Sequence, residues 1–248
     1  MPGSERETQT SKDMKRLILV LAGVFQFTDV LSQVRIDHAI MIVNDLDSAI
    51  ARYDHLGFTI KPGKLHENGL LNAHIKFQNG SAFELMTLSG IPGDKMARTY
   101  KQLLAEQEGG VYLALTGHQA DDLKAWLHDH QITYLEMEGK VWSYISFPED
   151  SPFAHLFFID YHFDMTTIND PTNHVNGMEG FQYIALEGDR ELINLLAGLG
   201  LFHRSDPGVF ETSTGDIQVI MPDTALKRPR LRAVSFKDKT GKVIRVDW

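Results

Sequence analysis

The chain has 248 residues, enough for one large domain or two small ones, and 43% of them are hydrophobic, so a sizeable core is expected. Its 24 lysines and arginines against 33 aspartates and glutamates give a net charge of −9, which argues against a surface for nucleic acid or anionic membrane. Cysteine is absent, which excludes disulfides, cysteine metal ligands and thiol nucleophiles.

Residues 1–34 are predicted to be a leader. The first 13 residues are polar, and the basic pair Lys15-Arg16 is followed by an apolar run over 17–25, which is too short to span a bilayer. This pattern is typical of a secretory signal over Met14–Ser32, although a buried strand or helix or a misassigned start codon also fits it. The protein is therefore expected in the cytoplasm, or outside it if this segment is a signal peptide.

Residues 35–90 are predicted to form a strand–helix–three-strand unit. A β-rich run over 35–43 precedes a helix that Asn44-Asp45 caps and Gly57 ends. Three strand candidates follow, at 58–65, 72–78 and 81–88. The Asn-Gly pair between the last two is a hairpin signal.

The same order recurs, after a connecting helix predicted over 91–108. The second unit, residues 109–163, comprises a strand at 109–116, a helix at 120–130 and strands near 132–138, 141–147 and 153–161. The third unit, 164–248, repeats the order more loosely, with a strand at 180–187 and a helix at 189–199. Such a repeat predicts several copies of one unit, each packing its helix on its own sheet, although an unrelated α+β segment is an alternative for the second copy.

A series of short motifs resembles the vicinal oxygen chelate superfamily, which includes glyoxalases, extradiol dioxygenases and fosfomycin-resistance proteins, and above all its glyoxalase-like domain branch. In chain order they are Ile36-Asp37-His38, Asn44-Asp45-Leu46-Asp47 with Tyr53 and Leu56-Gly57-Phe58, His66…Gly69…Asn72, Phe83-Glu84-Leu85-Met86, Pro152-Phe153 with Phe157–Asp160, His174…Asn176-Gly177, and Leu231-Arg232-Ala233 with Gly241-Lys242-Val243. The resemblance implies an α+β fold of repeated βαβββ modules. Its mixed, mostly antiparallel sheets would curl into half-open barrels with helices on the convex face and a divalent metal on the concave face.

Strand alternation sorts the side chains of the first unit between these two faces. His38, His74 and Glu84 fall on the concave face, and the superfamily's sheet order places the fourth strand between the first and the third. We therefore expect the three side-chain tips to converge. Two imidazoles and a carboxylate are suitable ligands for Fe, Mn, Zn or Ni, and Glu84 and His74 are also the candidate catalytic groups.

Other units contribute less to this site. The resemblance supports His38 and Glu84 directly, whereas His74 is added from geometry alone. In the second unit Tyr112 corresponds to His38, and Asp160, aligned with Glu84, is a further candidate ligand. The third unit has Phe181 in place of His38 and either Gln218 or Arg245 in place of Glu84, so a four-ligand glyoxalase I site is not expected. Asn72, Tyr112 and His66 are candidates for the substrate pocket.

Each of these residues also has a structural interpretation. His38 and His74 would then bond to backbone groups, and Lys76 would pair with Glu84 without a metal, because a buried carboxylate needs a partner. His66 and Asn72 would shape the loop before the third strand. His118, His128 and His130 are interpreted as solvated surface.

Two functions follow. The first is a metal-dependent lyase, isomerase or dioxygenase that chelates vicinal oxygens of a small oxygenated substrate. The alternative is a metal-free protein that keeps the pocket for a small-molecule ligand. A small molecule is the expected partner, without nucleic acid or a membrane span, and a homodimer is an open alternative for the assembly.

Overall fold

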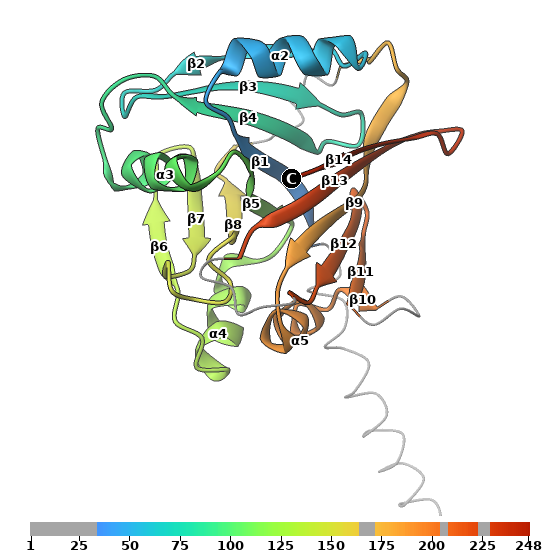
Figure 1. The fold of residues 1–248 in the computed structure, drawn as a ribbon. Coiled ribbons are helices and arrows are strands. Elements are labelled where there is room, and N and C mark those ends of the chain that lie inside the picture. Colours follow the sequence, from blue (N-terminus) through green and yellow to red (C-terminus); the bar gives the residue numbers. More distant parts are fainter. Residues whose placement is uncertain (1–33, 164–171, 204–207, 223–228) are drawn as a thin grey trace, which may run out of the picture.

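The structure, a computed structural model, describes residues 34–163, 172–203, 208–222 and 229–248 (Figure 1). The predicted signal segment Met14–Ser32 lies outside these residues, as does nearly all of the predicted leader. Within the described ranges, no helix is long and apolar enough to cross a membrane.

The first unit follows the predicted order of elements. Its elements are β1 (Arg35–Ile42), α2 (Leu46–His55), β2 (Lys61–Leu65), β3 (Leu70–Lys76) and β4 (Ala82–Leu88). The helix begins where the Asp45 carboxylate accepts the backbone N–H of Ser48 at 3.0 Å. It ends before Gly57, whose φ of +85° suits the left-handed turn that closes a helix.

The second unit continues the sheet of the first. After α3 (Lys95–Glu106) come β5 (Gly109–Thr116), α4 (Ala120–Asp129), β6 (Leu135–Glu138), β7 (Trp142–Ser146) and β8 (Leu156–Tyr161). Because β1 and β5 pair antiparallel, both units share one eight-stranded sheet of order β2-β3-β4-β1-β5-β8-β7-β6. The predicted position of β4 between β1 and β3 is confirmed.

The third unit forms a sheet of its own. Its elements are β9 (Met178–Glu187), α5 (Arg190–Gly198), β10 (Phe202–His203), β11 (Val209–Thr212), β12 (Gly215–Ile220), β13 (Leu231–Asp238) and β14 (Val243–Asp247). The six strands are ordered β10-β11-β12-β9-β13-β14, and β12 lies parallel to β9 as β4 lies parallel to β1. The strand β12 therefore completes this unit, so Arg245 on β14 is not the counterpart of Glu84.

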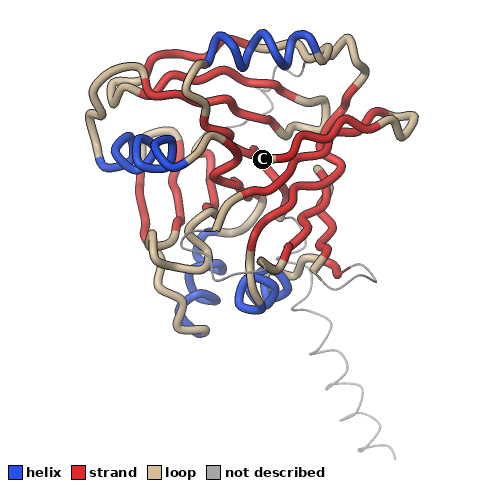
Figure 2. Tube along the Cα trace, in the orientation of Figure 1, coloured by secondary structure: helices blue, strands red, loops and turns tan. Residues whose placement is uncertain are grey.

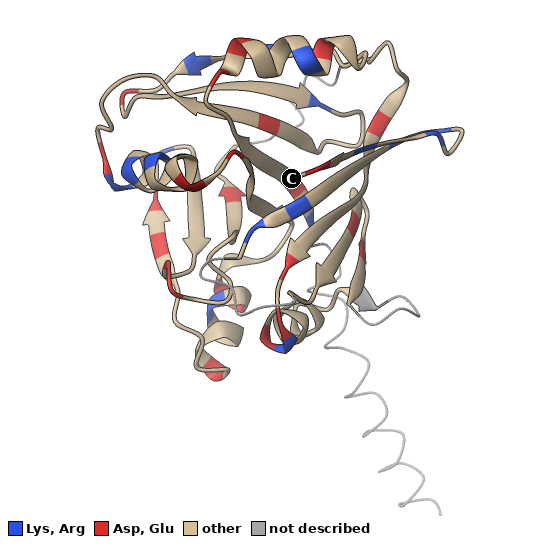
Figure 3. Ribbon diagram, in the orientation of Figure 1, with Lys and Arg blue, Asp and Glu red and all other residues tan. Residues whose placement is uncertain are grey.

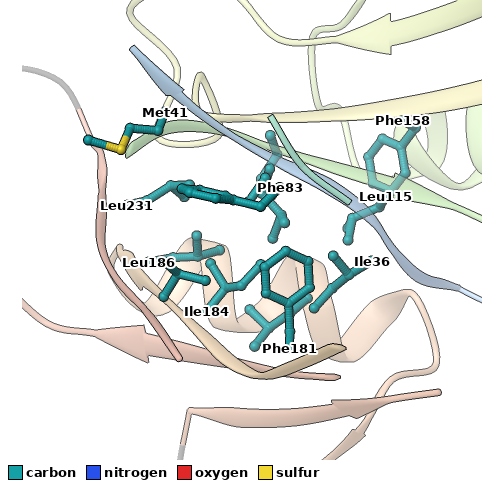
Figure 4. Packing of buried hydrophobic residues seen from close by; sticks show 14 of the residues in the cluster. Ile36, Met41, Phe83, Leu115, Phe158, Phe181, Ile184, Leu186 and Leu231 are labelled. Carbon is teal, nitrogen blue, oxygen red and sulfur yellow. The ribbon is translucent and has the colours of Figure 1, made fainter. Parts of the chain in front are cut away.

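The main core lies between the two sheets. Figure 4 shows side chains of the first sheet, among them Met41 and Phe83, facing Phe181 and Ile184 of the second. Phe236 of β13 packs against Phe58, Phe77, Phe83 and Phe181, with ring centroids 5.0–5.6 Å apart. The buried leucines of α4 and α5 belong to the same cluster.

This arrangement confirms the predicted fold class, and the four predicted helices appear as α2, α3, α4 and α5. Most strand pairs are antiparallel, with parallel pairs at β1–β4, β5–β8 and β9–β12. Neither sheet closes into a barrel, and Figure 2 shows the strands of both sheets as open layers, with α2 lying over β3 and β4. Lysines and arginines are dispersed among aspartates and glutamates along the ribbon (Figure 3).

Candidate functional site

Three polar side chains meet on one face of the eight-stranded sheet, here called the site face, which is turned away from the core between the sheets. His38 alternates along β1 with Ala39 and Met41, which belong to that core. On the neighbouring strands, His74 of β3 lies opposite Glu84 of β4. The predicted convergence is confirmed, because both imidazoles reach the same carboxylate.

The contacts with Glu84 are short and its carboxylate is buried. His38 Nε2 lies 3.7 Å from Glu84 Oε2, and His74 Nε2 lies 3.4 Å from Glu84 Oε1. The side chain of Glu84 is 9% exposed, that of His38 14% and that of His74 29%. His74 is therefore the member of the trio that solvent or a ligand reaches most easily. We call these three residues the triad.

Asn72 completes the environment of Glu84. Its amide Nδ2 donates to Glu84 Oε1 at 2.6 Å, and its Oδ1 accepts the backbone N–H of Lys64 at 3.0 Å. Burial alone would raise the pKa of Glu84, but hydrogen bonds from His74 and Asn72 and the charge of His38 outweigh burial and hold this pKa below its usual value. Glu84 is thus ionised at neutral pH without an ion pair to Lys76.

Asp37 contacts the Nδ1 side of the His38 imidazole. This Nδ1 lies 2.5 Å from Asp37 Oδ1, and Asp37 also accepts a hydrogen bond from the Tyr161 hydroxyl at 3.0 Å. Burial would lower the pKa of His38, but the hydrogen bond to Asp37 and the charges of Asp37 and Glu84 raise it above its usual value. With Nδ1 engaged by Asp37, Nε2 is the nitrogen that faces Glu84.

Aromatic side chains line the site face beside the triad. The ring of Phe157 on β8 meets that of His38 edge-on with centroids 5.5 Å apart, and Tyr144 and Tyr112 contact Phe157 in turn. Burial and the Glu84 carboxylate both raise the pKa of Tyr144, so its phenol stays protonated at neutral pH. Further along the same face, α3 covers Ile40, Ile42 and Met86 with Ala97, Tyr100 and Leu103.

The remaining predicted site residues lie at different places. Tyr112 is on the site face, in contact with Phe157 and Tyr100. The backbone of His66 forms the turn between β2 and β3, where its N–H donates to Leu70 and its carbonyl accepts from Gly69, as the structural interpretation expected. Asn72, by contrast, bonds to Glu84 of the triad as well as to the backbone of Lys64 in β2.

The structure does not bring Asp160 to the triad. Along β8, Phe157 and Tyr161 face the site, whereas Phe158 belongs to the core between the sheets, and Asp160 shares its parity. Accordingly, Asp160 acts electrostatically on His118, which packs against Phe158. The alignment of Asp160 with Glu84 was wrong, because the register of β8 on β5 puts Phe157, not Asp160, at the position that Glu84 holds on β1.

His118 also corrects an expectation. It is buried, at 7% exposure, and burial lowers its pKa, whereas His128 and His130 are exposed as predicted.

Sequence reasoning missed Asp37, Tyr161 and Tyr144 as members of the site. Asp37 stands in the motif that carries the resemblance, but regular alternation would turn it away from His38. The pairing of β1 with β5 skips from Ile36 to His38, so Asp37 is an extra residue in β1. Such a bulge changes the direction in which a side chain points, and no residue pattern in β1 predicts it.

Two imidazoles and a carboxylate are donor types that a divalent metal accepts. Ligands about 2.1 Å from one metal lie roughly 3–3.5 Å from each other, close to the separations of the two imidazoles from Glu84. As the side chains stand, no group of three or more His, Asp or Glu among the described residues is arranged to hold a metal ion. The Asn72 amide nitrogen lies beside both, 2.6 Å from Glu84 Oε1 and 3.4 Å from His74 Nε2.

A separate cleft of about 950 Å³ lies between the second unit and α5. Its lining includes Trp126, His130, Phe153 and Asn194 and none of the triad.

Comparisons with known proteins agree with this architecture. The glyoxalase-like domain family matches residues 36–199, which is more than half of the chain. No curated protein matches the chain. A solved structure of a hypothetical protein from Staphylococcus aureus is similar over 86% of this chain and 98% of that one, with 13% identity and a TM-score of 0.60, and this likeness shows the fold.

Two shorter structural likenesses cover about half of the chain. Methylmalonyl-CoA epimerase from Mycobacterium tuberculosis is 21% identical over 53% of this chain and 91% of that one, with a TM-score of 0.42. A hypothetical protein from Bacillus halodurans is 13% identical over 53% of this chain and 96% of that one, with a TM-score of 0.40.

Proposed function

Because the chain belongs to the glyoxalase-like domain family, within the vicinal oxygen chelate superfamily, we propose that it is a metal-dependent enzyme acting on a small oxygenated substrate at the site face. The observation that supports this proposal is the contact of two imidazoles with one buried carboxylate. One carboxylate and two imidazole nitrogens are suitable ligands for Fe, Mn, Zn or Ni. Three protein ligands leave coordination positions open for a substrate.

His38, His74 and Glu84 would hold the metal. When bound, a divalent ion there supplies Lewis-acid chemistry, polarising a carbonyl or holding two neighbouring oxygens of a substrate. Asn72 would give up its hydrogen bond to Glu84, and its amide would then be free to donate to a substrate oxygen. The substrate class is a small molecule with adjacent oxygens.

The protein's own groups are suited to moving a proton. Glu84 is ionised and His74 is the most exposed member of the triad, so these two are the candidate acid–base groups. Phe157, Tyr112 and Tyr144 of the second unit lie beside the triad and add apolar surface to the site face. This arrangement favours a lyase or isomerase reaction by proton transfer, and a dioxygenase reaction is the other chemistry that the donor set permits.

One observation favours the metal-free alternative. Glu84 already has three partners in Asn72, His38 and His74, so its burial is compensated without a metal. In that case the aromatic side chains of the site face would bind an uncharged small molecule, and the triad would fix its orientation.

Calorimetric titration with Zn²⁺, Mn²⁺, Fe²⁺ (under anaerobic conditions) and Ni²⁺ separates the two functions. The proposal expects one site per chain for at least one of these ions and loss of that site in Glu84→Gln, which keeps the volume but removes the charge. Asp160→Asn is the matched control, because it removes an exposed carboxylate from the opposite face, and it should bind like the unchanged protein. A folded, unchanged protein that binds none of the four ions would support the metal-free alternative.

A further inference from the structure

The side chains of Asp37 and Tyr161 form a chain of contacts that ends at His38. Tyr161 OH donates to Asp37 Oδ1 at 3.0 Å, and the same oxygen lies 2.5 Å from His38 Nδ1. Asp37 is buried, at 7% exposure. Burial and the neighbouring Asp37 raise the pKa of Tyr161, so its hydroxyl stays protonated and donates to the carboxylate.

The contact between Asp37 and His38 depends on the irregularity in β1. Adjacent residues of a regular strand point to opposite faces, so their side chains do not meet. Here Ile36 pairs with Leu115 and His38 with Ala114, which leaves Asp37 without a partner of its own on β5. The extra residue lets the carboxylate turn toward the imidazole.

Tyr161 reaches this carboxylate from the other unit. It stands at the end of β8, which β5 separates from β1 in the sheet. Its ring also contacts Phe163 at 5.7 Å between centroids, so removing the hydroxyl leaves its packing in place. The position of His38 in the first unit is therefore set in part by the second.

We propose that Asp37 and Tyr161 are positioning residues, which hold His38 with its proton on Nδ1 and its Nε2 directed toward Glu84. The carboxylate does so by accepting the Nδ1 proton, and the phenol does so by holding the carboxylate. The benefit to metal binding rests on the proposed function, whereas the orientation of His38 does not. Carboxylates in this place fix the tautomer of ligand histidines, and their loss typically costs about 10–100-fold in metal affinity.

Nitrogen NMR of the metal-free protein tests the orientation directly. With ¹⁵N-labelled histidine, and His38 assigned by its absence in His38→Gln, neutral His38 should carry its proton on Nδ1. Asp37→Asn should shift the population toward the Nε2–H form, because an amide can donate to Nδ1 where a carboxylate cannot. Tyr161→Phe should shift it in the same direction by a smaller amount, and Asp37→Glu should restore the Nδ1–H form at least in part.

Ser143→Ala is the matched control. It removes another hydroxyl next to an imidazole, the 2.7 Å contact with His162 Nε2, and should leave the His38 signals unchanged. An Nε2–H tautomer in the unchanged protein, or no change in a folded Asp37→Asn variant, would overturn the proposal.

Zn²⁺ affinity of the same variants is the second readout, with a loss of about 10–100-fold expected for Asp37→Asn. If the unchanged protein binds no metal but its tautomer responds to Asp37→Asn, the positioning role stands and the metal-dependent function fails.

Discussion

Glu84 of β4 and Phe157 of β8 occupy equivalent positions in the two halves of the eight-stranded sheet. Glu84 lies opposite Ile40 of β1, and Phe157 lies opposite Ala114 of β5. The antiparallel pairing of His38 with Ala114 and of Ile40 with Tyr112 relates the two halves by an approximate two-fold axis. The first unit thus supplies a carboxylate where the second supplies an aromatic ring. All three members of the triad therefore come from the first unit.

This equivalence leads to a gain-of-affinity prediction. The ring centroid of Phe157 is 5.5 Å from that of His38. The substitution Phe157→His therefore places a third imidazole, a possible metal ligand, beside the triad. We expect about tenfold tighter Zn²⁺ binding, or ~1.4 kcal/mol, measured by competition with a chromophoric chelator. Val243→His adds an imidazole to an exposed strand elsewhere and should leave the affinity unchanged. Equal affinities in the two variants would show that a side chain at position 157 does not reach the metal.

The contact between the sheets predicts the largest loss of stability. Phe236 is fully buried, and its ring meets four other phenylalanines, among them Phe83 of the first sheet and Phe181 of the second. Phe236→Ala should lower the free energy of unfolding by about 3–5 kcal/mol, because it removes a large buried side chain and leaves a cavity. Urea unfolding at constant pH measures this loss. Val243→Ala on the exposed neighbouring strand is the control, and a similar small effect for both would show that the sheets are not joined through Phe236.

A buried histidine predicts an acid-sensitive fold. His155 is 1% exposed, both of its ring nitrogens lack a hydrogen-bond partner among the described residues, and burial lowers its pKa to about 3. The unfolded chain takes up a proton at this residue near pH 6.5, whereas the folded chain does not. The contribution of His155 to stability is therefore complete above pH 6.5 and is lost as the pH falls below that value, toward about 3.

The expected loss is at most ~1.4 kcal/mol per pH unit, or about 2 kcal/mol at pH 5. Urea midpoints at pH 7 and pH 5 measure it. His155→Leu should weaken the pH dependence, whereas His128→Leu, at an exposed position, should retain it. An unchanged pH dependence in His155→Leu would show that His155 finds a partner or is protonated in the folded state.

Much of the fold follows from local patterns in the chain. The Asp45 cap and Gly57 bound α2, and the alternation of His38 with Ala39 and Met41 correctly separates the site face from the core. These predictions succeed because period and capping are properties of a few neighbouring residues.

The features of the site that the sequence does not predict depend on the register of the strands. The bulge that turns Asp37 toward His38 is set by the pairing of β1 with β5, which are far apart in the chain. The misplacement of Asp160 has the same origin, because one residue of shift in β8 moves a side chain to the other face. The packing of the third unit's sheet against the first sheet is a tertiary contact that the repeat itself does not specify.

The proposed function requires that His38, His74 and Glu84 bind one divalent metal. X-ray absorption at the metal edge of the zinc-loaded protein tests it most directly, because it identifies the atoms around the ion. We expect two imidazole nitrogens at about 2.0–2.1 Å together with at least one oxygen, and one imidazole fewer in zinc-loaded His38→Ala. A zinc shell without imidazole, or one that His38→Ala leaves unchanged, would contradict it.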